Sequence, residues 1–335
     1  MKTSFFLKPA LLLVACLFLM NVQSCKDPLQ GDIPRTLEPV ISTTEWQQMN
    51  GLHGSVTCFA KSGNSLFTGM YIGGIFRSDN NGALWQAVNN SLKNTDLQSL
   101  IASGNTLFAG INGEGILRST DNGATWQVMN SGLTSLSIYC LAASENTLFA
   151  GTVPSQTSAG GLFRSTDNGT TWQELTNGLT SKSIQSLTIS ENSLFAGTDK
   201  GLFRSIDYGM TWQAVNNGLT NAYIKSLTAV RGSILFAGRA DGGGVFRSMD
   251  NGITWQAVNN GLRTPAPAII SLTANGNTVF AGTSDGVFRL NNNGNSWQVV
   301  GIRLANILVL SLAVKGNTLF AGTNGEGAFR IGIPQ

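Results

Sequence analysis

The side chains best suited to chemistry recur in one fixed order along this chain: an arginine, a serine, an aspartate and a tryptophan. In residues 161–175, GLFRSTDNGTTWQEL, they are Arg164, Ser165, Asp167 and Trp172. The aspartate could be a catalytic acid or base, or a calcium ligand. Closely similar segments begin at Gly115, Gly201 and Gly244, and weaker copies begin at Gly74 and Gly286. Because the group recurs at nearly every copy, we interpret it as structural.

The local pattern also favours a structural role for these aspartates. EF-hand calcium loops need further oxygen ligands and a late glutamate, whereas here a Thr-Trp strand follows at once. Ser and Asp oxygens can instead accept hydrogen bonds from backbone amides of a tight turn, while Gly supplies a positive φ and Trp packs over the turn. The residues assigned to this structural turn are Asp121, Asp167, Asp207, Asp250, Trp126, Trp172, Trp212 and Trp255.

The tryptophan positions define the repeat that carries these groups. They occur at 46, 85, 126, 172, 212, 255 and 297, with spacings of 39 to 46 residues. Such a period is typical of β-propeller blades of four strands each. One unit shows four β-prone runs, at 184–190, 193–198, 201–205 and 211–215, joined by connections that allow only antiparallel neighbours. We name these strands A to D, from the axis outward.

The two ends of the chain contribute parts of one further unit. A lone D strand begins at Trp46, and strands A, B and C are expected at 309–315, 318–323 and 327–331. Pairing the first strand with the last sheet removes the exposed edges of an open array. The sequence therefore predicts an all-β fold over residues 45–335, a seven-bladed β-propeller of four-stranded antiparallel blades whose last blade is closed by the N-terminal strand.

The repeated pattern Ser-x-Asp-x-Gly-x-Thr-Trp resembles the Asp-box of the sialidase (BNR) repeat superfamily. Four copies match in full, and the likeness extends to the photosystem II stability-factor branch, which are assembly helpers; this resemblance implies a propeller and a protein partner. Sialidases use an arginine triad, an acid/base and a Tyr nucleophile supported by Glu. In that family one of these arginines belongs to a Phe-Arg-Ile-Pro motif near the beginning of the fold. Here the similar segment Phe329-Arg330-Ile331 comes at the far end of the chain, and Arg330 is one of seven equivalent arginines. We therefore assign no catalytic residue.

A second enzyme class stays open as the alternative. Other glycoside hydrolases of related shape use two carboxylates about 5–10 Å apart. Acids that are not part of the repeated turn fall in the B–C turns, where acids are also ordinary turn residues: Glu114, Asp199, Asp241, Asp285 and Glu326. The alternative function is thus a sialidase-like or other polysaccharide-cleaving enzyme at the cell surface.

The front of the chain predicts an envelope address. Residues 1–24 have the basic start and apolar core of a signal peptide, and Val22-Gln23-Ser24-Cys25 resembles the lipobox of bacterial lipoproteins. The resemblance implies acylation of Cys25, a flexible tether over 25–44, and a place on the outer membrane or cell surface. Ordinary secretion, with Cys25 as a bystander, is the alternative.

Composition narrows the set of partners. The chain has 21 Lys and Arg against 18 Asp and Glu, without the basic excess of a nucleic-acid-binding protein. The single His53 and the scattered acids form no metal constellation, and no cofactor motif is present. Cys58 and Cys140 lie two repeats apart and are expected to be free thiols. We expect a monomer that contacts the membrane only through its anchor.

The connections between strands predict where a partner binds. A–B and C–D turns share one face of an antiparallel blade, and B–C and D–A loops share the other. The second set varies between units, and loops that vary on a rigid frame commonly carry function. The candidate ligand-binding residues are Tyr71, Tyr223, Arg239, Asp241, Arg263 and Arg303. The predicted function is a binding or scaffold module for a protein or a glycan; drifted loops without a ligand are the other interpretation.

Overall fold

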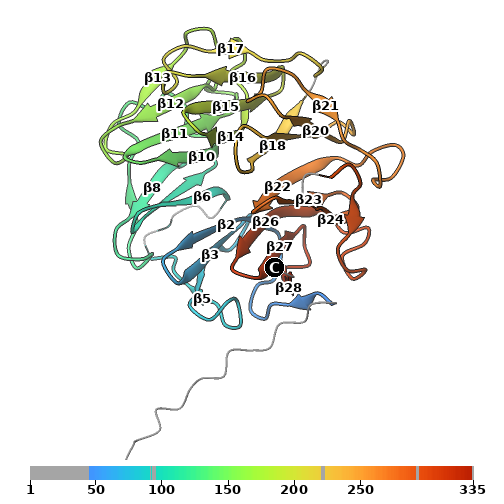
Figure 1. The fold of residues 1–335 in the computed structure, drawn as a ribbon. Helices are drawn as coiled ribbons and strands as arrows, with labels where there is room; N and C mark the ends of the chain where they lie inside the picture. The colour runs from blue at the N-terminus through green and yellow to red at the C-terminus, as the bar shows by residue number, and fades with distance from the viewer. Residues whose placement is uncertain (1–44, 91, 93–95, 220–222, 292–293, 334–335) are drawn as a thin grey trace, which may run out of the picture. The chain divides into compact units, whose positions relative to one another are not determined.

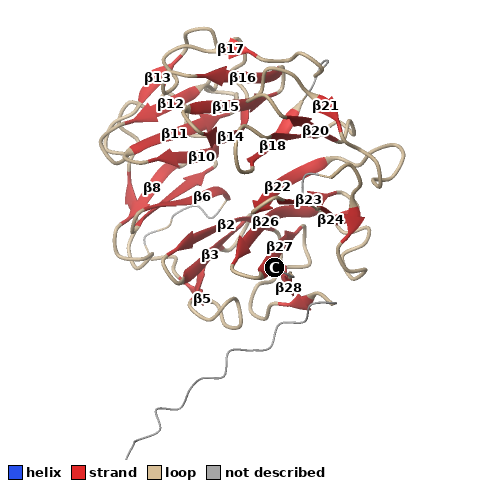
Figure 2. Cartoon of the chain, in the orientation of Figure 1, coloured by secondary structure: helices blue, strands red, loops and turns tan. Residues whose placement is uncertain are grey.

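The computed structural model describes residues 45–90, 92, 96–219, 223–291 and 294–333, all of them within the unit Pro39–Gln335. The predicted signal peptide (1–24), the lipidation site Cys25 and the tether (25–44) lie outside the described residues. The secondary structure of the described part is strand, turn and loop, without a helix (Figure 2).

The strands form seven four-stranded antiparallel sheets; in six of them the four strands are consecutive, and in the seventh the first strand of the chain joins the last three. The A strands are β2 Val56–Ser62, β6 Leu97–Ser103, β10 Ile138–Ser144, β14 Ile184–Ser190, β18 Ile224–Ala229, β22 Ile269–Asn275 and β26 Val309–Lys315. The B strands are β3 Ser65–Met70, β7 Thr106–Ile111, β11 Thr147–Thr152, β15 Ser193–Thr198, β19 Leu235–Arg239, β23 Thr278–Thr283 and β27 Thr318–Thr323.

The outer half of each sheet is built from the C and D strands. The C strands are β4 Gly74–Ser78, β8 Gly115–Ser119, β12 Leu162–Ser165, β16 Gly201–Ser205, β20 Val245–Ser248, β24 Gly286–Leu290 and β28 Ala328–Gly332. The D strands are β5 Gln86–Ala87, β9 Gln127–Val128, β13 Gln173–Leu175, β17 Gln213–Ala214, β21 Gln256–Ala257, β25 Gln298–Val299 and β1 Gln47–Gln48.

The seven sheets are the blades of a closed propeller. Each A strand packs on the A strands of the blades before and after it, and β26 packs on β2 to complete the ring (Figure 1). The seventh blade has the order β1-β28-β27-β26, with Gln47 opposite Arg330 and Gln48 opposite Phe329. The predicted fold class, including closure by the N-terminal strand, is confirmed.

The predicted bounds of A, B and C in the fourth blade agree with β14, β15 and β16, but strand D is shorter than predicted. Residues 211–215 were expected, whereas β17 comprises only Gln213–Ala214. The Thr211 amide donates to Asp207 in the turn, and the Trp212 amide donates to the Asn177 carbonyl of the preceding blade. These two residues therefore bond within the turn and to the neighbouring blade rather than to strand C.

The hydrophobic core is divided into clusters between adjacent blades. One cluster joins Phe108 and Ile116 of the second blade to Ile138, Leu148 and Trp172 of the third. The glycine of each B strand permits this close approach. A Cβ on Gly151 would lie only 2.6 Å from Cγ2 of Ile184 in the next blade. The small residues in the repeated B strand are thus required by the inter-blade contact.

Candidate functional site

The two ends of the propeller differ in their connections. The face that carries the A–B and C–D turns is called the turn face, and the face with the B–C and D–A loops is called the loop face. Grooves on the turn face lie between the A–B turns and a C–D turn of neighbouring blades, as where Gly63, Asn64 and Asn105 meet Asp121 and Asn122. This arrangement follows from the antiparallel order of each blade.

The aspartates of the repeated motif lie in the C–D turns and bond within them. Asp167 Oδ1 accepts from the Ser165 hydroxyl at 2.8 Å and from the Thr171 amide at 2.9 Å, and its Oδ2 accepts from the Thr171 hydroxyl at 2.6 Å. The Ser165 oxygen in turn accepts from the Gly169 amide at 2.9 Å. The same bonds recur around Asp121, Asp207 and Asp250.

These bonds stabilise the charged form of the carboxylates. Hydrogen bonds from the Thr125 hydroxyl and amide, and from Ser119, lower the pKa of Asp121 to about 2. The equivalent bonds from Thr171 and Ser165 lower the pKa of Asp167 to about 2. A carboxylate held ionised by its own turn is a poor general acid near neutral pH. This geometry fits the structural role that the sequence indicated.

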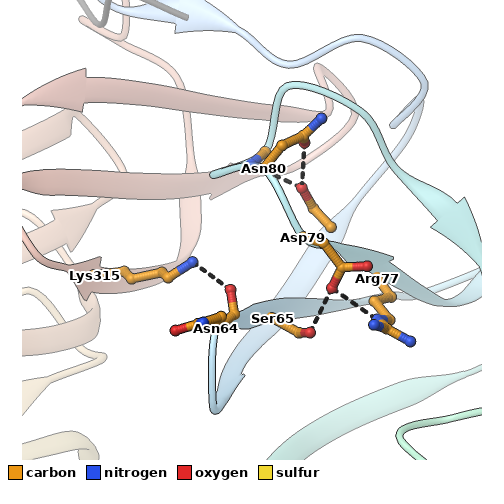
Figure 3. Close-up of polar contacts among 8 residues, drawn as sticks. Asn64, Ser65, Arg77, Asp79, Asn80 and Lys315 are labelled. Carbon is orange, nitrogen blue, oxygen red and sulfur yellow. Dashed lines mark hydrogen bonds and ion pairs between the residues drawn. The ribbon is translucent and has the colours of Figure 1, made fainter. Parts of the chain in front are cut away.

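The first blade reaches the same turn with different residues (Figure 3). Asn80 takes the aspartate's place, accepting from Ser78 at 3.0 Å and from the Leu84 amide at 2.9 Å. Asp79 points outward, accepts from the Ser65 hydroxyl and pairs with Arg77 at 2.9 Å. Figure 3 also shows Lys315 of the last blade donating to the Asn64 carbonyl, at 2.6 Å. Because Asn80 accepts these turn bonds through its side-chain amide oxygen, the turn does not require a carboxylate.

Several of the repeated arginines of strand C link neighbouring blades, whereas Arg204 and Arg289 bond Ser193 and Gln298 of their own blades. Arg118 donates to the Asn168 carbonyl at 3.0 Å, and Arg164 donates to the Tyr208 carbonyl at 3.3 Å. Arg330 is buried and donates to the Asn81 carbonyl at 2.6 Å, across the junction between the last and first blades. Each of these bonds between blades reaches the C–D turn of the next blade.

The predicted ligand-binding residues are distributed over the loop face rather than gathered at one point. Tyr71 lies in the exposed B–C turn of the first blade, with 49% of its surface accessible. Arg239 and Asp241 of the fifth blade form a two-fold ion pair, with nitrogen–oxygen distances of 2.8 and 2.7 Å.

The two remaining arginines bind groups of the sixth and seventh blades. Arg263 donates to Asn306 at 2.7 Å and lies 3.6 Å from Asp285. The guanidinium of Arg303 lies 5.3 Å from the ring centre of Phe329. Each of these arginines therefore already has partners in the protein.

A cavity of about 340 Å³ lies on the propeller axis, and sequence reasoning missed it. One residue from the A strand of every blade lines it: Thr57, Gln98, Tyr139, Gln185, Lys225, Ile270 and Leu310. We call this cavity the axial pocket. Each of the seven is the second residue of its strand, just after the D–A loop, so the pocket lies toward the loop face.

A β-bulge in every blade creates these seven positions. In the first blade, Val56 pairs with Met70 and Cys58 with Gly69, which leaves Thr57 as the extra residue; the same shift occurs in all seven sheets. A bulge adds one residue against a single partner and can re-aim its side chain. The residue after the bulge is Ser or Cys, and several of these bond the next blade, as Ser311 does at the Val56 carbonyl.

Lys225 is the cation of the axial pocket. Its ammonium lies 4.2 Å from the ring centre of Tyr139 and donates to Gln185 Oε1 at 3.3 Å. Burial lowers the pKa of Lys225 to about 8. Burial, with the nearby charge of Asp96, raises the pKa of Tyr139. Tyr223, a predicted site residue, lies two residues before Lys225, and burial raises its pKa.

One signal in the sequence could have identified the pocket. The first, third and fourth positions of strand A have similar residue types in every unit, whereas the second position is Thr, Gln, Tyr, Gln, Lys, Ile and Leu in turn. Comparing loops alone overlooked this position because it lies inside a strand.

The turn face is less uniform than the sequence suggested. In the fourth and fifth blades its C–D turns carry exposed Ile206, Met210, Met249 and Ile253, where the second and third blades have Thr or Ala. Ile206 and Met249 expose 69% and 61% of their surfaces. This apolar group gives the turn face a feature of its own.

Two further features are absent from the described part of the chain. It contains no cluster of three or more His, Cys, Asp or Glu side chains that could hold a metal ion. Nor does it contain a helix long and apolar enough to cross a membrane. Cys58 and Cys140 are free, and burial raises the pKa of each thiol to about 12.

The fold and the axial pocket define the class of this protein: a seven-bladed β-propeller with a ligand-sized cavity on its axis. The chain belongs to the DUF6242 beta propeller domain family, which matches residues 38–174 and 152–268. A search of the curated proteins finds no significant match.

Several solved structures share the fold. The extracellular domain of BT4673 from B. thetaiotaomicron, described as part of a one-component system, has a TM-score of 0.70 at 16% identity over 86% of this chain. YCF48 bound to D1 peptide gives 0.70 at 15% identity over 88%, covering 98% of that structure. The GH74 enzyme of Niastella koreensis gives 0.67 at 19% identity over 85%. This chain spans 40% of the BT4673 structure and 53% of the GH74 enzyme.

Proposed function

We propose that this protein is a binding or scaffold module of the bacterial cell envelope, anchored by lipid at Cys25, that holds a protein or a glycan at its loop face. The observation that carries the proposal is the contrast between a frame repeated in every blade and the differing side chains at the loop-face end. Seven equivalent bulges present seven positions with six residue types. A rigid frame with variable groups at one end is a common arrangement for binding.

The comparisons support the same class of function. One propeller of this fold has been solved with a peptide bound, and another is an extracellular domain. The repeated Ser-x-Asp turns, with their shared hydrogen bonds, support placing the chain among the Asp-box propellers. In the predicted alternative, a glycoside hydrolase, two acids of the B–C turns would be catalytic. Asp199 accepts from Ser181 at 2.6 Å and Asp241 pairs with Arg239, so both already have partners.

The experiment is capture of envelope proteins and glycans by the full chain, compared between matched variants. Tyr71→Ala with Arg239→Ala changes the loop face. Ile206→Thr with Met249→Thr gives the fourth and fifth blades the threonine found in the second and third, and so tests the turn face. We expect the first pair to reduce capture and the second pair to leave it unchanged.

The opposite pattern of capture would place the partner on the turn face and contradict the proposal. Release of sugars from a polysaccharide panel, abolished by Asp241→Asn, would instead establish the hydrolase. The anchor is tested separately: radiolabelled palmitate should enter the wild-type chain and should not enter Cys25→Ser.

A further inference from the structure

The ammonium of Lys225 has few electrostatic partners for its position. No Asp or Glu lies within 4 Å of it among the described residues. Its partners are the face of Tyr139, at 4.2 Å, and the amide oxygen of Gln185, at a long 3.3 Å. An ammonium carries three N–H donors, so this cation can donate further hydrogen bonds to a bound group.

The wall of the axial pocket is divided into two halves. Going round the ring, the second to fifth blades contribute Gln98, Tyr139, Gln185 and Lys225, all of them polar or amphipathic. The sixth and seventh blades contribute Ile270 and Leu310, and the first contributes Thr57. The Thr57 hydroxyl donates to the Leu97 carbonyl of the next blade at 2.6 Å. Ile270 of the sixth blade is next in the ring to Lys225 of the fifth, so the apolar half begins directly beside Lys225.

Two acids affect the tyrosines near the axis: beside burial, the charge of Asp96 raises the pKa of Tyr139, and that of Asp199 raises the pKa of Tyr223. Asp96 accepts from the Gln98 amide at 2.6 Å and from the Asn112 amide at 3.0 Å. It precedes the A strand of the second blade, three blades away from Lys225 in the fifth. An anion would therefore be favoured on the Lys225 side of the pocket and disfavoured on the Asp96 side.

We propose that the axial pocket binds a small organic monocarboxylate, with the carboxylate at Lys225 and an apolar body against Ile270 and Leu310. One cation balances one negative charge. Phosphate would bring up to two charges and commonly binds several cations or a row of backbone amides. A cavity of about 340 Å³ is at the small end of the range for ligand sites, which fits a small acid better than a polymer.

The desolvation of Lys225 supports this assignment. Burial lowers the pKa of the free ammonium to about 8 because the charged form is poorly solvated there. A bound carboxylate would compensate for the missing solvation, so its contribution to affinity would be larger than that of a surface ion pair. The inference goes beyond the proposed function, because a small acid needs no macromolecule on the loop face.

The test is calorimetric titration of the full chain with phenylacetate and hexanoate, beside their uncharged analogues phenylacetamide and 1-hexanol. We expect saturable binding of the two acids and binding of the analogues that is weaker by about tenfold or more. Lys225→Met should weaken binding of the acids by a similar factor. Lys200→Met, which removes an exposed lysine from a B–C turn of the same face, should leave the affinity within about twofold.

Further variants keep the result decisive. Leu310→Asn should weaken binding of both acids if their apolar bodies pack on this wall, and a thermal melt shows whether each variant is folded. Equal binding of acids and analogues, no saturable binding of either acid, or an unchanged affinity in folded Lys225→Met overturns the proposal.

A peptide terminus is the alternative ligand for this pocket. Stronger binding of a Leu-ending peptide than of both acids, lost on C-terminal amidation, would assign the pocket to a peptide terminus instead. Arg239→Ala should reduce macromolecule capture and leave acid binding intact, so the two proposals fail separately.

Discussion

Replacement of Lys225 by methionine should stabilise the folded protein. Methionine keeps the length of the side chain and its contact with the Tyr139 ring while removing the charge. The lysine pKa falls from 10.5 to about 8 on folding, which corresponds to roughly 3 kcal/mol of unfavourable free energy near neutral pH. The lost cation–π contact, worth about 0.5–2 kcal/mol, acts in the opposite direction. Because Lys225 also keeps some contact with solvent, we expect a net gain of about 1–2 kcal/mol.

The lowered pKa of Lys225 determines how the stability of the folded protein changes with pH. Between pH 8 and 10.5 the unfolded chain retains a proton on Lys225 that the folded chain has lost, so the wild type gains stability as pH rises. The advantage of Lys225→Met should therefore be greatest below pH 8 and fade toward pH 10.5. Cys140 lies nearby and burial raises its pKa to about 12, while the pKa of Tyr139 is also raised. In the unfolded chain the thiol ionises near pH 9 and the phenol near pH 10, so above about pH 9 both groups lower the stability of wild type and Lys225→Met alike. The trend is therefore measured as the difference between the two proteins, in which this shared loss cancels.

Calorimetric melts of wild type, Lys225→Met and Lys200→Met at pH 7, 9 and 10 measure this effect. At pH 7 we expect Lys225→Met to melt about 2–5 °C above wild type and Lys200→Met to melt within about 1 °C of it. A lower melting temperature for Lys225→Met at pH 7, or a difference that grows with pH, would refute the reasoning that burial of this cation is costly.

Three further predictions concern the frame, each read from thermal melts. Deleting residues 45–50 removes buried Trp46 and the strand that closes the ring, and should lower the melting temperature by about 10 °C or more; an unchanged melt would contradict the closure. Asp167→Ala should cost about 1–2 kcal/mol while Asp167→Asn costs less, because Asn80 performs this role in the first blade; equal losses would contradict the turn geometry. Gly151→Ala should destabilise the fold by about 1–3 kcal/mol, since the added Cβ would meet Ile184 of the next blade. Gly104→Ala is the control: a Cβ there meets nothing within 4 Å, so only the smaller cost of its positive φ should appear.

Much of the frame could be predicted from the sequence because each blade repeats the same local signals. Apolar runs bounded by Gly, Asn and Thr gave the A, B and C strands of the fourth blade at their observed bounds. Strand D was overextended because Thr211 and Trp212 have high β propensity. Their amides bond the turn and the preceding blade, and a propensity cannot detect such partners.

The variation at the second position of strand A marks the axial pocket in the sequence, but the repeated local signals do not show that these side chains share a cavity, because that depends on register. Whether Thr57 or Cys58 is the extra residue is decided by pairing with β3, which the apolar pattern of β2 alone does not determine. The variation of the loops between units predicted Arg239 and Arg263 as ligand-binding residues. The structure shows how those side chains are already bonded, which no reading of loop composition provides.

The contacts that each loop-face cation already makes decide where a bound anion would gain the most free energy. Arg239 gives two N–H groups to Asp241 at 2.8 and 2.7 Å, so an anion there would compete with a formed ion pair. Arg263 lies beside Asp285 and Asn306, and Arg303 lies over the Phe329 ring on the outer part of the seventh blade. Among the described residues, the polar contacts of the partly buried Lys225 ammonium are a ring face and one long amide contact. Since an anion gains most where a cation is desolvated and unpaired, the axis offers it more than the rim does.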